Sequence, residues 1–440
     1  MKRTHSGIPA VFAVTLGCPK NRVDTEVMLG DLLSHGWALA GRAEDADVLL
    51  VNTCGFLAAA RAESVDVLRD IARRARPGAR LVAAGCMVER FRDELEDAVP
   101  EVRVFVGTRE LLSIRGALAG DAPARTPDSG PRLVTTPSHV AYLKVAEGCS
   151  RRCAFCIIPR IRGRQRSRAA DEVVAEARAL AAGGVRELVL VAQDLTHWGA
   201  DLPGRPGLAT LVRRLDAEVP DARWIRLMYL FPRDLPDDLL DAVAESPRVL
   251  PYLDIPVQHA DDRVLRAMRR GTTRRGLEAD VARIRARVPG VALRTTFMVG
   301  FPGETDEAFE GLLDFARAAR FEMAGVFRFS AEPGSHAAAL PDPVPGRVAR
   351  DRERRLQAVL SEVAASSRTA MRGRIHDAVV ESPDGRRSVG RLWMQAPEVD
   401  GVVRIDGSRR MRARDLAPGR FVRVRITGAE GPDFLAEPAP

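Results

Sequence analysis

The 440-residue chain contains no uncharged apolar run that approaches the roughly 18 residues needed to span a bilayer, which argues against a helical membrane protein. Aromatic residues make up only 5% of it, so we do not expect a broad base-stacking surface for single-stranded nucleic acid. The N-terminal segment lacks the small-residue cleavage site of a signal peptide. We therefore expect a cytoplasmic protein that makes no contact with membranes.

Lysine is also scarce, with only Lys2, Lys20 and Lys144 among 67 basic residues. Most of the net charge of +8 is thus carried by arginine, and it permits an anionic partner such as RNA without identifying one. The hydrophobic share of 46% excludes a disordered chain, and the length predicts two or three domains.

The chain has only six cysteines, and a reducing cytoplasm disfavours pairing them as disulfides. Metal or redox chemistry is the better interpretation. Their spacing separates them into two groups of three. Cys18, Cys54 and Cys86 are dispersed, whereas Cys149, Cys153 and Cys156 form a compact C-x3-C-x2-C loop.

The first group lies in a segment where short apolar runs alternate with amphipathic stretches, which predicts a parallel sheet covered by helices. The predicted strands are Ala10–Leu16, Asp47–Asn52, Arg80–Ala84 and Arg103–Val106, and the predicted helices are Val23–Leu33, Leu57–Arg74, Val88–Ala98 and Arg109–Leu118. Each of the three cysteines follows the carboxyl end of a predicted strand, where open α/β sheets bind ligands, so we expect them to converge. The alternative is three separate buried structural cysteines.

A second alternating series predicts six β/α units, two fewer than a closed eight-stranded barrel, and hence a partial barrel that opens at the carboxyl ends of its strands. The predicted strands are Val140–Val145, Glu187–Ala192, Trp224–Tyr229, Pro251–Ile255, Ala292–Val299 and Gly325–Phe329. Helical patterns between them include Ala169–Ala182, Leu208–Ala217, Asp237–Glu245, Asp261–Arg269 and Glu304–Ala319.

Segments rich in proline, glycine and polar residues, 120–137 and 331–346, are predicted linkers. After a charged helix, Arg347–Arg368, short β-type runs predict a small antiparallel barrel. Those runs are Ala378–Glu381, Ser388–Met394, Gly401–Ile405 and Phe421–Ile426. The resulting fold class is α/β, with an N-terminal domain at 8–120, a partial barrel at 138–346, a connecting helix at 347–370 and a β-barrel at 371–438.

The compact cysteine loop offers three thiolates, one fewer than the four ligands of a structural zinc site. An iron–sulfur cube with three protein ligands would keep one iron open for a small molecule. Seven arginines and no acidic residue lie between Arg151 and Arg168, which would compensate an anionic cluster or attract an anionic substrate. The alternative is a solvated charge run.

The loop Cys149-x3-Cys153-x2-Cys156 resembles the radical S-adenosylmethionine (SAM) motif. That resemblance implies a 4Fe–4S cluster whose open iron binds SAM, and reductive cleavage of SAM to a 5′-deoxyadenosyl radical. The wider segment Glu147–Pro159, with Arg162-Gly163, Asn52–Gly55 and Gly85-Cys86, is similar to the methylthiotransferase family. The likeness runs from about Val11 to Val424 and implies a TRAM-like domain at the end. It also implies that Cys18, Cys54 and Cys86 hold a second, auxiliary 4Fe–4S cluster.

The family has two branches, one acting on an isopentenyl-adenosine of transfer RNA and one on an aspartate of small-subunit ribosomal protein uS12. The resemblance favours the ribosomal branch, because several segments are similar to its members. These segments are Leu16–Asn21, Met228-Tyr229, Tyr252–Pro256 and Arg294–Glu304. It implies transfer of a methylthio group to the β-carbon of the aspartate, with two molecules of SAM consumed. The partners are then uS12, free or within the 30S subunit, and an electron-donating reductant, with room for contact to rRNA. The transfer-RNA enzyme is the alternative.

Further candidates for contact with SAM follow barrel strands, where barrel enzymes place ligand contacts. They are Gln193, Asp194, Gly300, Gly303 and Glu304. For the last three an ordinary explanation exists, since Pro302-Gly303 forms a turn and acidic residues are favoured in the first turn of a helix.

Overall fold

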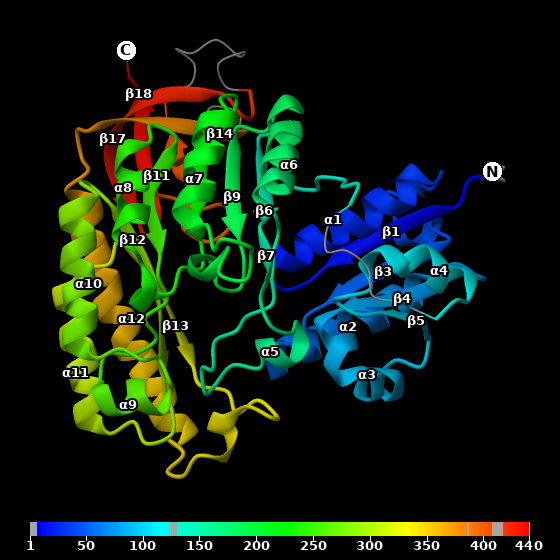
Figure 1. The fold of residues 1–440 in the computed structure, drawn as a ribbon, viewed down its shortest axis with the longest axis horizontal. Helices are drawn as coiled ribbons and strands as arrows, with labels where there is room; N and C mark the ends of the chain where they lie inside the picture. Colours follow the sequence, from blue (N-terminus) through cyan, green and yellow to red (C-terminus); the bar gives the residue numbers. More distant parts are fainter. Residues whose placement is uncertain (1–6, 123, 125–129, 385–386, 407–416, 440) are drawn as a thin grey trace. The chain divides into compact units, whose positions relative to one another are not determined.

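The computed structural model describes residues 7–122, 124, 130–384, 387–406 and 417–439. Part of the predicted linker at 120–137 and parts of the predicted C-terminal barrel therefore lie outside the described residues. The chain divides into two compact units, each described by itself (Figure 1). Unit 1 comprises residues 1–135, 147–151 and 156–166, and unit 2 comprises 136–146, 152–155 and 167–440. The four domain boundaries expected from the sequence stay a prediction.

Unit 1 contains a five-stranded parallel sheet in the order β2-β1-β3-β4-β5. Its strands are β1 (Ala10–Thr15), β2 (Ala38–Leu39), β3 (Val48–Thr53), β4 (Arg80–Gly85) and β5 (Val102–Val106). Its helices are α1 (Pro19–Ser34), α2 (Ala58–Arg74), α3 (Cys86–Ala98), α4 (Ile114–Ala119) and α5 (Ile158–Ile161), with 3-10 turns at Ala43–Asp45 and Leu111–Ser113. Every residue of β3 is buried, as expected of a central parallel strand covered on both faces.

The predicted elements of this unit are present, with shifted ends. Helix α1 begins at Pro19, four residues before the predicted start, because Pro at the first helical position lacks only an N–H that has no partner there. The predicted helix Arg109–Leu118 is instead a 3-10 turn followed by the short α4. The two-residue strand β2, at the sheet edge, was not predicted because two residues show no periodicity.

Unit 2 contains a six-stranded parallel sheet in the order β13-β12-β11-β10-β9-β6, which agrees with the predicted six β/α units. Its strands are β6 (Val140–Lys144), β9 (Glu187–Val191), β10 (Trp224–Leu227), β11 (Val249–Asp254), β12 (Ala292–Val299) and β13 (Met323–Arg328). Its helices are α6 (Ala170–Ala182), α7 (Gly207–Glu218), α8 (Asp237–Glu245), α9 (Asp262–Ala267), α10 (Arg274–Arg287), α11 (Asp306–Ala319) and α12 (Gly346–Thr369). The short strands β7 (Ala146–Glu147) and β8 (Arg166–Ser167) form a separate pair.

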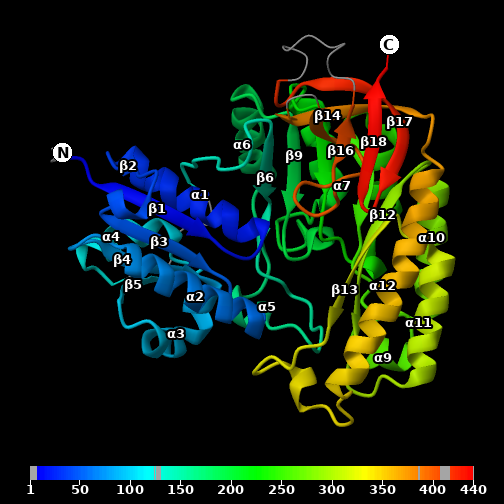
Figure 2. The same ribbon diagram turned by 180° about the vertical axis from the view of Figure 1, so that it is seen from behind.

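The long helix α12 packs beside α11 and leads into a closed five-stranded barrel (Figure 2). The barrel strands are β14 (Ile375–Asp384), β15 (Arg387–Leu392), β16 (Val403–Ile405), β17 (Phe421–Glu430) and β18 (Asp433–Pro438). The sequence predicted four of these strands and missed β18. The predicted antiparallel barrel is present, with the difference that β16 and β18 pair in parallel.

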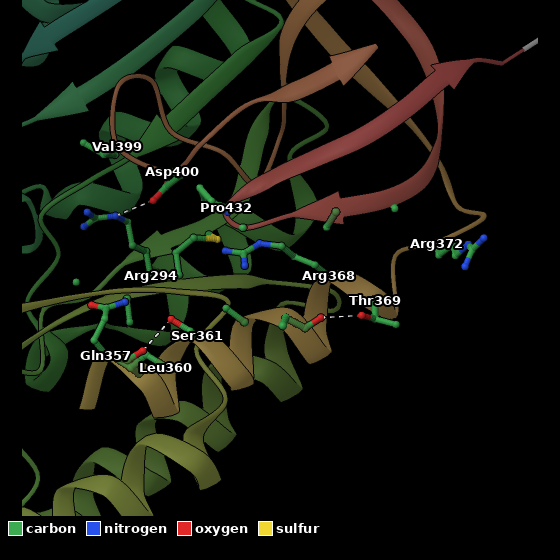
Figure 3. A pocket seen from close by; sticks show the side chains of 18 residues that line it. Arg294, Gln357, Leu360, Ser361, Arg368, Thr369, Arg372, Val399, Asp400 and Pro432 are labelled. Carbon is green, nitrogen blue, oxygen red and sulfur yellow. Dashed lines mark hydrogen bonds and ion pairs between the residues drawn. The ribbon is translucent and has the colours of Figure 1, made fainter. Parts of the chain in front are cut away.

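Buried charges join the barrel to the six-stranded sheet within unit 2. Glu187 of β9 binds Arg226 of β10 and Arg391 of β15, with N–O distances of 2.7 and 2.6 Å, and all three side chains are at most 1% exposed. Asp400 accepts a hydrogen bond from the Tyr252 hydroxyl at 2.6 Å. It also binds Arg294 at 3.0 Å (Figure 3). The C-terminal barrel is therefore anchored to the sheet by its own polar side chains.

A cavity of about 780 Å³ lies beside this junction, between α12, β13 and the barrel. Arg368 extends from α12 toward its interior, and Arg294 and Asp400 line the side nearer the sheet (Figure 3). Among the described residues, no helix is long and apolar enough to cross a membrane.

Candidate active site

The three dispersed cysteines follow three neighbouring strands of unit 1. Cys18 caps the N-terminus of α1 after β1, Cys54 directly follows β3, and Cys86 is the first residue of α3 after β4. All three are free thiols, Cys86 being buried and the other two half-buried. Since β1, β3 and β4 are adjacent and parallel, their carboxyl ends place these residues at one edge of the sheet.

Close backbone contacts show that the three cysteine segments meet. A methyl group on Gly17 would lie 3.0 Å from both Cβ and Sγ of Cys54. A methyl group on Gly55 would lie 2.7 Å from the carbonyl oxygen of Cys86. Glycine at these two positions lets the Cys18, Cys54 and Cys86 segments pack directly against one another. The structure thus brings together the three residues that the sequence predicts to converge.

Substituting Gly55 by alanine should disturb this packing, because the added methyl group would push the Cys54 segment away from Cys86. We expect Gly55→Ala to lower the iron bound by unit 1 after anaerobic reconstitution. Gly41→Ala is the matched control, since nothing lies within 4 Å of a methyl group there. Equal iron content in the two variants would contradict a requirement for close packing at Gly55.

The three cysteine sulfurs suit an iron–sulfur cluster better than a hard cation such as Mg²⁺, which prefers oxygen ligands. Thiolates are the usual ligands of iron–sulfur clusters, and three of them leave one iron open. Within the described chain, no three His, Cys, Asp or Glu side chains are already gathered as a metal-binding group. The three cysteines follow neighbouring strands at one edge of the sheet, so rotation of their side chains would bring the sulfurs toward a shared cluster. The assignment of this cluster is a proposal, developed below.

Burial favours the neutral form of these thiols when no metal is bound. It raises the pKa of Cys86 to about 12, a shift that the nearby Arg162 guanidinium opposes and the neighbouring Cys18 and Cys54 reinforce. Burial also raises the pKa of Cys54. Because cluster ligands are thiolates, binding of a cluster here should release protons, which makes iron uptake more favourable at higher pH.

Arg162 is the most enclosed side chain of the arginine-rich segment, at 1% exposure. It follows α5 and donates through Nε to the sulfur of Cys86 at 3.3 Å. Its Nη1 donates to Glu147 and its Nη2 to Asp24, each at 2.9 Å. Both carboxylates are at most 1% exposed, so the three charges form a buried network at the cysteines.

Asn21 completes this network from the first turn of α1. Its side-chain amide donates to the carbonyl oxygens of Leu16 and Thr53, at 2.9 and 3.1 Å, which ties the ends of β1 and β3 together. Its Oδ1 lies 3.5 Å from the sulfur of Cys86 and also accepts from Arg162. The turn after Cys18 therefore contributes structure to all three cysteine segments.

The compact cysteine loop passes from unit 1 to unit 2 and back. Cys149 and Cys156 belong to unit 1 and Cys153 to unit 2, so each is described within its own unit. The N–H of Cys149 donates to the carbonyl oxygen of Gly163 at 3.0 Å, and the N–H of Arg151 donates to the Cys149 sulfur at 3.4 Å.

Cys153 is held in unit 2 by the segment after α9. Arg270 donates to the Cys153 sulfur at 3.4 Å, and its guanidinium stacks on Phe231 at 4.2 Å from the ring centre. The N–H of the next residue, Ala154, donates to the carbonyl oxygen of Met268 at 3.0 Å. A cation thus faces the sulfur of one compact-loop cysteine, as Arg162 faces Cys86, which suits an anionic thiolate cluster.

The side chain of Glu304, a predicted contact for SAM, forms hydrogen bonds with neighbouring residues of the protein. Its Oε2 accepts from the backbone N–H groups of Gly300 and Phe301, at 2.6 and 3.2 Å, and its Oε1 accepts from Arg352 at 3.1 Å. Gly300 has a positive φ of 77°, and a methyl group there would lie 2.7 Å from Cβ of Ala349. Glu304 therefore fixes the turn at the end of β12, and any contact of Gly300, Gly303 or Glu304 with SAM stays a prediction.

The remaining candidates lie at the strand ends of the same sheet. Gln193 and Asp194 follow β9, with Asp194 only 3% exposed. His259 is fully buried in the segment after β11, where its Nδ1 accepts from the N–H of Asp261 at 3.0 Å. Burial lowers the pKa of His259 to about 4, so it is neutral at physiological pH.

Sequence reasoning missed the individual roles of Arg162, Asp24, Asn21, Glu147 and Arg270. It treated the seven arginines of 151–168 as one group. One signal was available: Asn21 and Asp24, in the first two turns of the helix that follows Cys18, are three residues apart and so lie on one face of α1.

Three family models match the chain, in the order in which the structure places the corresponding parts. The model "Uncharacterized protein family UPF0004" matches residues 10–107, "Radical SAM superfamily" matches 143–316, and "TRAM domain" matches 373–438. These ranges contain the sheet of unit 1, most of the sheet of unit 2 and the C-terminal barrel.

Curated relatives align over almost the whole chain. The ribosomal protein uS12 methylthiotransferase RimO of Anaeromyxobacter sp. (strain K) is 47% identical over 97% of this chain and 92% of its own length. The RimO of Myxococcus xanthus is 44% identical over 97% of this chain and 91% of its own.

Solved structures support the fold alone. The radical SAM methyltransferase TsrM of Kitasatospora setae shares 16% identity over 73% of this chain and 75% of its own, with a TM-score of 0.53. The RimO relatives are 44–47% identical to this chain over 97% of its length, and this similarity shows the family. The chain belongs to the RimO-type methylthiotransferases of the radical SAM superfamily.

Proposed function

We propose that the protein installs a methylthio group on the β-carbon of an aspartate of ribosomal protein uS12. The observation that carries this proposal is the sequence identity of 44–47%, over 97% of the chain, to proteins named uS12 methylthiotransferases. The cysteine content supports it, because the chain has two groups of three cysteines, and three thiolates could hold an iron–sulfur cluster with one iron left open. The alternative substrate, an isopentenyl-adenosine of transfer RNA, has no such support among these relatives.

The chemistry requires a radical, since the hydrogens on the aspartate β-carbon are not acidic enough for side-chain acid–base catalysis. Cys149, Cys153 and Cys156 would hold a 4Fe–4S cluster that, with SAM bound and an electron supplied, provides the 5′-deoxyadenosyl radical for hydrogen abstraction. Gln193 and Asp194, at the end of β9, are proposed contacts for SAM.

Cys18, Cys54 and Cys86 would hold the second 4Fe–4S cluster, which would supply the site for the sulfur of the methylthio group. The fit rests on three converging free thiols and on the guanidinium of Arg162 directed at one of them. Each group has three cysteines, so each cluster would have one iron without a thiolate ligand and open to a small molecule.

An anaerobic assay of the reconstituted protein tests this substrate. Free uS12, 30S subunits and transfer RNA that carries isopentenyl-adenosine are each incubated with SAM and a reductant. We expect uS12, free or in the subunit, to gain the mass of a methylthio group less one hydrogen, at an aspartate located by fragmentation. Methylthio-adenosine in the transfer RNA, with unmodified uS12, would contradict the proposal. The comparison of free uS12 with 30S subunits shows whether rRNA contact assists.

A further inference from the structure

We propose that Arg162 is a positioning residue for the auxiliary cluster: its guanidinium donates to the Cys86 sulfur and raises the cluster's reduction potential. The inference rests on the proposed function, because it presumes that Cys86 is a cluster ligand. It goes further by naming a residue that no cysteine motif contains and giving it a measurable electronic effect.

The geometry leaves little freedom to the guanidinium. Asp24 and Glu147 hold Nη2 and Nη1 from two different segments, each at 2.9 Å, and this directs Nε at the sulfur of Cys86, 3.3 Å away. Planar guanidinium groups offer donors in a fixed fork, so two held donors fix the direction of the third. With all three charged side chains at most 1% exposed, water does not compete for these bonds.

A charge and a hydrogen bond at a ligand sulfur change the stability of the two oxidation states unequally. The reduced cluster carries one more negative charge, so a guanidinium beside its sulfur stabilises the reduced form more than the oxidised one. Hydrogen bonds to cluster sulfurs and net charge are known determinants of cluster potential. Removing Arg162 would also leave Asp24 and Glu147 without their shared cation, which lowers the potential further.

Arg162 also connects the auxiliary site to the segment that carries the compact loop. Glu147 lies two residues before Cys149, and the carbonyl oxygen of Gly163, next to Arg162, accepts from the Cys149 N–H at 3.0 Å. If Arg162 had a purely structural role, it would hold these segments together without changing the reduction potential of the cluster. An electronic role predicts in addition that the potential changes while the cluster is retained.

The test measures the auxiliary cluster alone, in a Cys153→Ala background that lacks one ligand of the other cluster. Arg162→Lys and Arg162→Gln are introduced into it, and the midpoint potential is followed by EPR during redox titration. We expect both variants to titrate at more negative potentials than the parent, Gln further than Lys, because Lys keeps the charge but not the fixed fork. Arg132→Gln is the control, since Arg132 forms a buried ion pair with Glu26 in the same unit.

An unchanged potential in either cluster-bearing variant of Arg162 would overturn the proposal, as would a shift of equal size in Arg132→Gln. A folded Arg162→Lys protein that binds no iron would also overturn it, by showing a role in assembly and not in tuning. Absence of any cluster in the Cys153→Ala parent, by contrast, would contradict the proposed function itself. The two failures are therefore distinguishable.

Discussion

Cys153→Ala should abolish formation of 5′-deoxyadenosine, whereas Cys18→Ala should leave it intact and abolish only methylthio transfer. Cys153 would be one of three ligands of the cluster at which SAM is cleaved, and a cluster with two protein ligands is not expected to retain SAM-binding geometry. Cys18 belongs to the other group, in unit 1, at the carboxyl end of β1. Loss of either activity should be complete within detection, since no side chain replaces a cluster.

Two measurements separate the outcomes. Iron and sulfide analysis after anaerobic reconstitution should show that each variant loses about one of two clusters, the number that two three-thiolate sites imply. Chromatography of the reaction mixture should then show 5′-deoxyadenosine from Cys18→Ala and none from Cys153→Ala. Ser150→Ala is the control in the compact loop, because Ser150 is exposed and its hydroxyl accepts a hydrogen bond from the Gln165 N–H.

Loss of both clusters from either single variant would contradict two independent sites, and so would 5′-deoxyadenosine formation by Cys153→Ala. The split between the two products is the sharper readout, because a general folding defect would reduce both together. Far-UV circular dichroism of each apoprotein checks that the fold is kept.

The strand-end positions of Cys18, Cys54 and Cys86 could be predicted because they depend on local patterns. Each follows a short apolar run, and a parallel sheet places all carboxyl ends of its strands at one edge. Their convergence could therefore be predicted without knowledge of contacts between distant segments. The six β/α units of the second sheet were predictable for the same reason.

The network around Arg162 depends instead on contacts between distant segments. Arg162 and Asp24 are 138 residues apart, and both carry charges that a sequence pattern assigns to the surface. Only the fold shows that one arginine of seven is enclosed by two carboxylates and a thiol. The pairing of β16 with β18 was equally hidden, because a parallel pair at a barrel closure has no local turn signal.

Glu187→Gln should produce a large loss of stability at a position away from the cysteines. Glu187 is fully buried and binds both Arg226 and Arg391, themselves at most 1% exposed. Removing its charge leaves two buried guanidiniums without a shared anion, and breaking such a buried pair costs about 3–5 kcal/mol. Urea unfolding followed by circular dichroism should show the reduced midpoint. Glu218→Gln is the control, since Glu218 also binds two arginines, Arg178 and Arg214, but at the surface.

The pH dependence of this difference gives a second check on the same carboxylate. Burial alone would raise the pKa of Glu187, but the adjacent guanidiniums of Arg391 and Arg226 outweigh burial and lower it below the ordinary 4.5. A carboxyl with a lowered pKa contributes stability that is present above its unfolded value and is lost as the pH falls through its folded value. The gap between wild type and Glu187→Gln should therefore be full at neutral pH and shrink in acid. A gap that stays constant across that range would show that packing, and not charge, anchors the barrel to the sheet.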